Sequence, residues 1–302
     1  MADNQLGKYL NPEIVSAVKR LDLQAKCIVD GYLSGRHHSP NHGFSTQFSE
    51  HRSYIKGDPL KDIDWKVYAR SNKYTVRKYE AETNLECTLI VDISSSMGFK
   101  HEKSSFSKLE YAICLSAALS LLLTKQQDSV GLITFDNKVR HYIRPASKRS
   151  HLMSILNTLI QVETGEPTIY ADSLPSAVSL LRHRGLVVLF TDLLGDTESA
   201  LKTLQILSHQ KHDVIVFQIF DPIEIDLNYD YLMDFQDTEN SNTHIIAHPE
   251  QIKQAYRAEI NKFIEATKTS CENARITYCF MSSAEPFDKA IQEFMKRRSR
   301  KA

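Results

Sequence analysis

Short, continuous apolar runs recur along the chain from residue 87 onward, and segments with helical spacing separate them. The runs occupy residues 87–91, 129–135, 186–190, 214–220 and 276–281. Such runs, rich in β-branched side chains and without helical periodicity, predict strands that are buried on both faces of a sheet. Because helical segments alternate with them, the pattern predicts an α/β fold with a doubly wound, mostly parallel sheet.

The segments between these strands have the apolar spacing of helices. Helices are expected over residues 107–125, 152–160, 198–210 and 249–271, from residue 171 onward, and again toward residue 297. The first is apolar on almost all sides and should be buried, and Ser107 and Glu110 have the spacing of a capping box. A tight turn at 136–137 joins the strand at 129–135 to another at 139–143, so one edge strand should be antiparallel.

The first 84 residues follow a different pattern. An amphipathic helix is expected over 12–29, and strands over 44–55 and 74–80. The sequence Gly-Asp-Pro at 57–59 is a turn signal, because proline fixes φ and aspartate bonds to its own backbone. We therefore expect a smaller N-terminal α+β subdomain at 1–84 and a large domain at 85–302.

Charge and composition narrow the range of partners. The chain has 37 basic and 37 acidic residues and a formal net charge of zero, so nothing favours nucleic acid or a membrane surface. Its five cysteines are far apart and contain no Cys-x-x-Cys, which is typical of reduced thiols in a cytosolic protein. No signal peptide is recognisable, and the longest nearly apolar segment, 112–123, is too short to span a bilayer. We expect a cytoplasmic protein without a membrane span. This expectation is compatible with association with membrane-bound partner proteins.

The candidate chemistry lies at the end of the first apolar run. Asp92 closes the strand at 87–91, and Ser94 and Ser96 follow it. One carboxylate and two hydroxyls at the carboxyl end of a buried strand make a hard-oxygen site for a divalent cation. The simpler alternative is that Asp92 caps the strand end and the serines cap the next helix.

The spacing Asp92-x-Ser94-x-Ser96 resembles the metal-ion-dependent adhesion site, MIDAS, of von Willebrand factor A domains. A longer match adds Gly57-Asp58, Asp64-Trp65, Ala69-Arg70 and Glu80-x-Glu82. On these motifs the chain resembles, almost end to end, the bacterial family catalogued as domain of unknown function number fifty-eight. That family couples an N-terminal subdomain to a von Willebrand A-like domain. Its members commonly have Pro and Arg where this chain has Lys56 and Lys61, which weakens the case for a bidentate arginine there.

The resemblance implies two further ligands. It puts Thr168 at the position of the A domain's distal threonine, although local sequence fits an ordinary N-cap or turn hydroxyl equally well. It also puts Asp192 at the family's second acidic position. Asp192 follows the apolar run at 186–190, so a second carboxylate is expected at the carboxyl end of a second buried strand.

Together Asp92, Ser94, Ser96, Thr168 and Asp192 would offer a cation only oxygen ligands. Such ligands favour Mg²⁺, with Mn²⁺ or Ca²⁺ as substitutes. Because most of them are neutral, the ion should stay electrophilic and accept an Asp or Glu of a partner protein as its last ligand. The expected affinity for the bare ion is weak, on the order of 10⁻⁴ to 10⁻³ M.

The favoured function is a metal-dependent protein-interaction, or adaptor, module rather than an enzyme. The resemblance adds a MoxR-type AAA+ ATPase as partner and a role in chaperone-like maturation or assembly of other proteins. The chain has no Gly-x-x-x-x-Gly-Lys-Ser/Thr motif, so ATP hydrolysis would come from that partner. The alternative is a metal-dependent phosphoryl hydrolase with Asp92 as nucleophile, but the acid/base aspartate of such enzymes would fall at Ser94.

Other polar clusters have simpler explanations. Three histidines within 37–42 could bind zinc, but no fourth ligand is near and a solvated loop is favoured. The acids and arginines around Trp65 could be acid/base groups or, more simply, an ion-pair lattice. The acidic segment at 221–239 could be a partner surface, although a solvated loop is favoured. The basic residues at 296–301 could contact nucleic acid or acidic protein, or merely complement a helix dipole.

Overall fold

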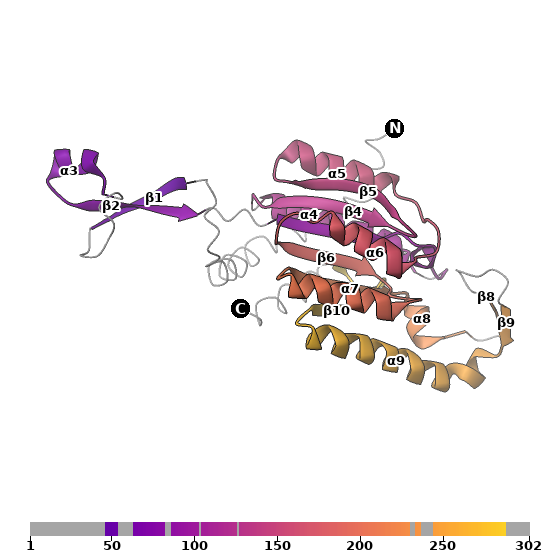
Figure 1. Cartoon of the computed structure of the whole chain (residues 1–302). Coiled ribbons are helices and arrows are strands. Elements are labelled where there is room, and N and C mark those ends of the chain that lie inside the picture. Colours follow the sequence, from indigo (N-terminus) through magenta and orange to yellow (C-terminus); the bar gives the residue numbers. More distant parts are fainter. Residues whose placement is uncertain are drawn as a thin grey trace. The chain divides into compact units, whose positions relative to one another are not determined.

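The computed structural model (Figure 1) describes residues 46–53, 63–81, 86–102, 104–125, 127–229, 233–236 and 244–287. These residues belong to two compact units, one within Leu33–Asn84 and one that contains everything from Leu85 onward. The predicted helix at 12–29, the three histidines, the turn at 57–59 and the C-terminal basic residues lie outside the described residues.

The smaller unit contains an antiparallel pair of strands and a short helix. Strand β1 (Thr46–Ser53) pairs antiparallel with β2 (Thr75–Ala81), and α3 (Trp65–Ser71) lies between them in sequence. Asp64 caps α3, because its side chain accepts hydrogen bonds from the backbone N–H of Lys66 and Val67 at 3.0 and 3.2 Å. Asp64 is therefore a helix N-cap, and Trp65 is exposed. The ion-pair lattice expected around Trp65 stays a prediction.

The larger unit is built on a six-stranded sheet. Its strands are β3 (Glu86–Asp92), β4 (Ser129–Phe135), β5 (Val139–Ala146), β6 (Leu186–Thr191), β7 (Asp213–Phe220) and β10 (Thr277–Ser282). They lie in the order β10-β7-β6-β3-β4-β5, and every pair is parallel except β4 with β5. This is the predicted doubly wound, mostly parallel sheet with one antiparallel edge strand, so the fold class is confirmed. The strands β3 and β6 are central: β3 ends in Asp92, and Asp192 follows the last residue of β6.

Helices cover both faces of the sheet. They are α4 (Lys108–Lys125), α5 (Arg149–Gln161), α6 (Tyr170–Ser179), α7 (Thr197–His209) and α9 (Pro249–Asn273). Helices α6 and α7 and the end of α9 bury their apolar sides in one core with alternate residues of the strands, while α4 packs on the other face (Figure 1). No helix in the described part of the chain is long and apolar enough to cross a bilayer.

Helix α4 begins with the capping box that the sequence predicts. The backbone N–H of Glu110 donates to Ser107 Oγ, and the N–H of Ser107 donates to Glu110 Oε2, both at 3.0 Å. The helix is buried on most sides, as its apolar composition indicates. Its first residue is nevertheless a lysine, Lys108, whose side chain is completely buried.

The prediction of an irregular, solvated segment after β7 was wrong for its first part, and residues 237–239 lie outside the described residues. A short helix, α8 (Pro222–Asp226), begins there, and β8 (Met233–Gln236) pairs with β9 (His244–Ala247) beyond it. Asp221 and Glu224 form a second capping box around the start of α8. Asp221 is fully buried, so the acidic residues of this turn belong to the fold and not to a solvated loop.

Candidate functional site

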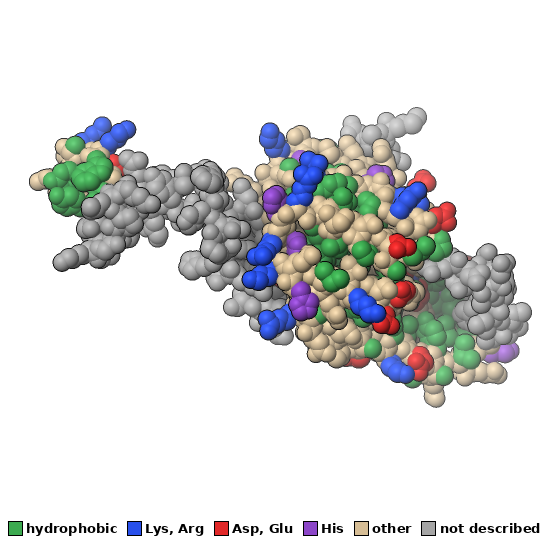
Figure 2. All heavy atoms as spheres, in the orientation of Figure 1, with side chains coloured by type: hydrophobic (Ala, Val, Ile, Leu, Met, Phe, Trp, Pro, Cys, Tyr) green, Lys and Arg blue, Asp and Glu red, His purple; other side chains and the backbone are tan. Residues whose placement is uncertain are grey.

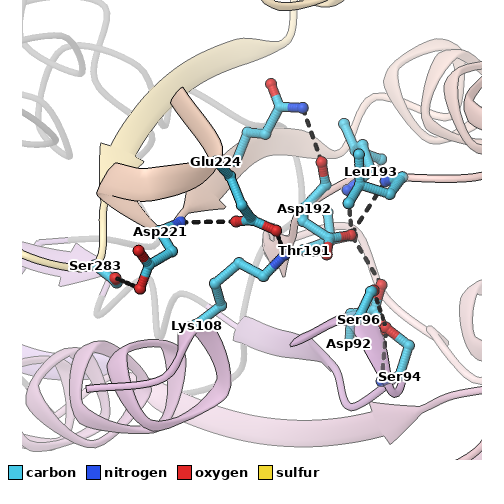
Figure 3. A network of polar contacts seen from close by, with 12 residues as sticks. Asp92, Ser94, Ser96, Lys108, Thr191, Asp192, Leu193, Asp221, Glu224 and Ser283 are labelled. Carbon is cyan, nitrogen blue, oxygen red and sulfur yellow. Dashed lines mark hydrogen bonds and ion pairs between the residues drawn. The ribbon is translucent and has the colours of Figure 1, made fainter. Parts of the chain in front are cut away.

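Asp92 lies at the carboxyl end of the central strand β3 and is completely buried. Its Oδ1 accepts hydrogen bonds from Ser94 N and Thr168 Oγ1, both at 3.0 Å. Its Oδ2 accepts from Tyr170 OH and Thr191 Oγ1, both at 2.8 Å. The two hydroxyls on Oδ2 also lie 2.8 Å from each other. Four donors from three chain segments therefore converge on one carboxylate (Figure 3 shows the side with Thr191).

The two predicted serine ligands lie beside it. After β3 the chain turns into a single 3₁₀ turn, Ser96–Gly98, which brings Ser94 Oγ within 3.1 Å of Ser96 Oγ. Both side chains are buried and lie on the Asp92 side of the cluster in Figure 3. Two hydroxyl oxygens are thus held next to each other and next to the carboxylate.

The loop that carries Thr168 is tied down at Gly165. The N–H of Gly165 donates to Ile93 O at 2.6 Å, which attaches the loop to the end of β3. A Cβ on Gly165 would lie only 2.1 Å from Asp136 Oδ2, so a side chain does not fit there. The close approach of this loop to the strand end explains why a residue 76 positions from Asp92 reaches it.

Asp136 holds the same loop in place through a hydrogen bond to its backbone. Its carboxylate accepts from Arg140 Nε at 2.8 Å and from the backbone N–H of Lys138 and Glu166, each at 3.1 Å. Burial alone would raise the pKa of Asp136, but the hydrogen bonds from Arg140, Lys138 and Glu166 outweigh it and lower the pKa. Asp136 is therefore an ionised anchor for the turn before Thr168.

Asp192 lies at the carboxyl end of the neighbouring strand β6 and is also completely buried. Its Oδ1 accepts from Leu194 N at 3.1 Å, and its backbone carbonyl accepts from Gln218 Nε2 at 2.8 Å. Its Oδ2 accepts from Lys108 Nζ at 2.9 Å. The second predicted acid is thus in the cluster, but one of its oxygens is engaged by an ammonium group.

Lys108 was missed by sequence reasoning. Its buried ammonium bridges Asp192 and Glu224 Oε1, the latter at 2.7 Å, and lies 5.9 and 5.8 Å from the ring centroids of Phe99 and Phe220 (Figure 3). Burial lowers the pKa of Lys108, but the charges of Asp192 and Glu224 outweigh it, and the net pKa is raised. The signal that could have found it is a lysine at the start of a helix otherwise apolar on nearly every side.

The acids of the cluster outnumber the cation that touches them. Burial, and then the charge of Asp192, raise the pKa of Asp92, although hydrogen bonds from Ser94, Tyr170 and Thr191 act in the opposite direction. Burial and the charge of Asp92 raise the pKa of Tyr170 well above its ordinary value, so this hydroxyl stays protonated and donates. When Asp92, Asp192 and Glu224 are ionised, Lys108 leaves two negative charges uncompensated among these four described residues.

This arrangement suits a hard divalent ion. Asp92, Ser94, Ser96 and Thr168 bring a carboxylate and three hydroxyls together. Asp192 directly follows Thr191, whose hydroxyl donates to Asp92. No group of three or more His, Cys, Asp and Glu side chains in metal-binding arrangement occurs among the described residues, so an ion here would depend on hydroxyl oxygens. Metal binding by these five residues stays a prediction.

The chain is similar in sequence and structure to several known proteins. Proteins called "uncharacterized" from Mycobacterium tuberculosis and Mycobacterium bovis are 27% identical to it over 225 residues, covering 73% of this chain and 69% of theirs. Among solved structures, BatB from Bacteroides thetaiotaomicron is 18% identical, with a TM-score of 0.47 over 72% of this chain and 99% of that one. An aerotolerance-related membrane protein from Bacteroides fragilis is 19% identical, with a TM-score of 0.45 over 72% and 100%.

The VWA domain of SpRpn10 is also similar, at 8% identity and a TM-score of 0.39 over 69% of this chain and 95% of that domain. The family model described as "Protein of unknown function DUF58" matches residues 50–267, which is more than half of the chain. The matched residues include most of the antiparallel strand pair of the smaller unit and all of the Asp92 cluster, as the sequence motifs predict. The chain is therefore a member of the DUF58 family.

Proposed function

We propose that the cluster around Asp92 binds a divalent cation, preferably Mg²⁺, and that the bound ion captures an acidic side chain of a partner protein. The observation that carries this proposal is the convergence of Asp92, Ser94, Ser96 and Thr168 at the carboxyl edge of the sheet. Asp92, Ser94, Ser96, Thr168 and Asp192 would hold the ion, with Mn²⁺ or Ca²⁺ as substitutes.

The net negative charge of the cluster supports the binding of a divalent cation. Two uncompensated negative charges in a buried site are costly unless they are paired or coordinate a metal. A dication would neutralise them and would also favour the ionised form of Asp92, opposing the effect of burial on its pKa.

Lys108 supports the second half of the proposal. Its ammonium already neutralises part of the charge of Asp192, so the ion would face one carboxylate without an ammonium partner, Asp92, and neutral hydroxyls. An ion with so few anionic ligands keeps a strong attraction for one more, which an Asp or Glu of a partner would supply. Affinity for the ion alone should be weak, on the order of 10⁻⁴ to 10⁻³ M.

The partner we propose is a MoxR-type AAA+ ATPase, with the protein acting as an adaptor in maturation or assembly of other proteins. This part rests on family membership. The sequence has no P-loop lysine motif of its own, so the partner would hydrolyse ATP.

The residue types around Asp92 favour binding over phosphoryl transfer. The position of a second acid/base aspartate holds Ser94, whose hydroxyl cannot serve at neutral pH. We therefore propose an interaction module and not an enzyme.

The test is a magnesium-dependent affinity capture with the full chain as bait. Wild type should retain a MoxR-type ATPase in Mg²⁺ and release it in EDTA, whereas Asp92→Asn should retain it in neither. Glu259→Gln, at an exposed acid of α9, is the matched control and should behave as wild type. Capture that is the same with and without chelator, or that survives Asp92→Asn, would contradict the proposal, as would magnesium-dependent phosphatase turnover lost in Asp92→Asn.

A further inference from the structure

A second candidate site lies at the opposite end of the same sheet. A cavity of about 230 Å³ opens where β3 and β6 begin and β5 ends. Its walls include Arg144 from β5, Arg182 and His183 from the turn between α6 and β6, and His212 from the turn between α7 and β7. Three chain segments that are distant in sequence thus supply basic side chains to one cavity.

The positive charge of this cavity is not neutralised within the described part of the chain. Neither Arg144 nor Arg182 has an ion pair with a described carboxylate, and Glu86 is the one acid among the lining residues. Arg184 and Lys211 add charge in the same two turns. Figure 2 shows this polarity on one face: Lys, Arg and His gather at the end where β6 and β7 begin, and Asp and Glu gather at the other end.

His212 adds a polar atom that lacks a partner. Its half-buried ring makes a backbone hydrogen bond with Gly185, and burial lowers the pKa of the ring. Its Nδ1 is buried and has no hydrogen-bond partner in the described structure. His212 is also one of the residues that line the cavity.

The walls of the cavity are held in place by the sheet. Gly185 lies so close to β3 that a Cβ would be 2.1 Å from Glu86 O, and its own carbonyl accepts from Asp213 N at 3.0 Å. Lys211 adopts a left-handed φ of 67°, which turns the chain sharply into β7. The turns that carry Arg182 and His212 are therefore fixed before any ligand arrives.

We propose that this cavity binds phosphate, either as the free anion or as the terminal group of a small phosphate ester. Guanidinium groups are fork-shaped donors that match phosphate oxygens, and two of them reach the cavity from different elements. The phosphate oxygens would accept hydrogen bonds from the guanidinium groups of Arg144 and Arg182. The volume accommodates a phosphate with a short organic tail and excludes a large macromolecular ligand from its interior.

The test is calorimetry with the full chain, in EDTA and at constant ionic strength set by chloride. Inorganic phosphate and glycerol 3-phosphate are the two probes: equal affinity assigns the site to the free anion, and tighter binding of the ester assigns it to an ester. The double variant Arg144→Gln/Arg182→Gln should weaken binding at least about tenfold, because each probe loses two charged hydrogen-bond donors. Arg149→Gln, outside the cavity on α5, should bind as wild type.

Wild-type protein that binds neither probe would overturn the proposal, as would a double variant that binds both unchanged. Unaltered thermal unfolding of the double variant in phosphate-free buffer would show that its fold is intact. Its magnesium affinity should also be unaltered, because the Asp92 cluster lies at the other end of the sheet. Unaltered magnesium affinity in the double variant would show that the two sites are independent. Either proposal could then be refuted without the other.

Discussion

The two ends of the larger unit's sheet differ in both charge and burial: the carboxyl end has buried acids, and the amino end has exposed bases. At the carboxyl end, Asp92 and Asp192 are fully buried, and each of their carboxylate oxygens accepts at least one hydrogen bond. At the amino end, Arg144 and Arg182 are exposed at the rim of a cavity and have no carboxylate partner among the described residues. Residues of the first end therefore belong to the fold and to the site together, whereas those of the second can change without disturbing the fold.

The largest expected effect is that of Lys108→Met. It leaves Asp192 and Glu224 buried without their counter-ion, so the free energy of unfolding should fall by about 3–5 kcal/mol. Urea denaturation measures this difference. Lys202→Met, at an exposed pair with Glu198, is the matched control and should leave stability close to that of wild type. Equal effects of the two variants would show that the carboxyl end does not depend on its internal cation.

Gly165→Ala should come next. Its new Cβ would collide with Asp136, so the loop or the anchor must move, at a cost of about 2 kcal/mol. Thermal and urea unfolding of this variant can be compared with Glu163→Ala, an exposed position of the same loop. Wild-type stability for Gly165→Ala would mean that the loop carrying Thr168 is not pinned as described.

Asp136→Asn should have a smaller effect that depends on pH. Folding lowers the pKa of Asp136 from its ordinary 3.8, so its ionised form stabilises the protein at neutral pH, by about 1.5 kcal/mol relative to Asn. That contribution is present above the unfolded pKa and is lost as pH falls through the folded pKa. Unfolding free energies of wild type and variant should therefore converge below about pH 4. A difference that stays constant with pH would refute this role.

The smallest effect on stability is expected at the amino end. Arg144→Gln and Arg182→Gln should each alter the unfolding free energy by no more than about 0.5 kcal/mol, because these side chains are exposed and unpaired in the described structure. Chemical denaturation in phosphate-free buffer measures this. A loss as large as that of Gly165→Ala would mean that the basic end is structural, and the contrast between the two ends would disappear.

The sequence predicts the sheet well because periodicity and strand length are local properties. The run that ends at Asp92 and the run that ends before Asp192 are strands at neighbouring positions, and their carboxylates share one edge. The capping box at Ser107 and Glu110 is equally local and is confirmed. The same reasoning missed the second capping box at Asp221, although its Asp-Pro-x-Glu spacing carries the signal.

Lys108 and Tyr170 could not be found in this way. A lysine in the first turn of a helix is ordinary, and its burial depends on Glu224, which lies 116 positions away. Tyr170 contacts Asp92 only because the Gly165 loop crosses the end of β3. Tertiary contacts of this kind leave no periodic trace, whereas the serines next to Asp92 are placed by local spacing alone.

The most direct test of the central claim is calorimetric titration of Mg²⁺ into wild type and Asp92→Asn at physiological ionic strength. We predict one weak site in wild type, with a dissociation constant on the order of 10⁻⁴ to 10⁻³ M. Asp92→Asn should show no measurable binding, because the amide has no negative charge to offer the ion. A cooperative unfolding transition of the variant in EDTA would show that it is folded. Absence of magnesium binding in wild type, or equal binding in both proteins, would contradict the account.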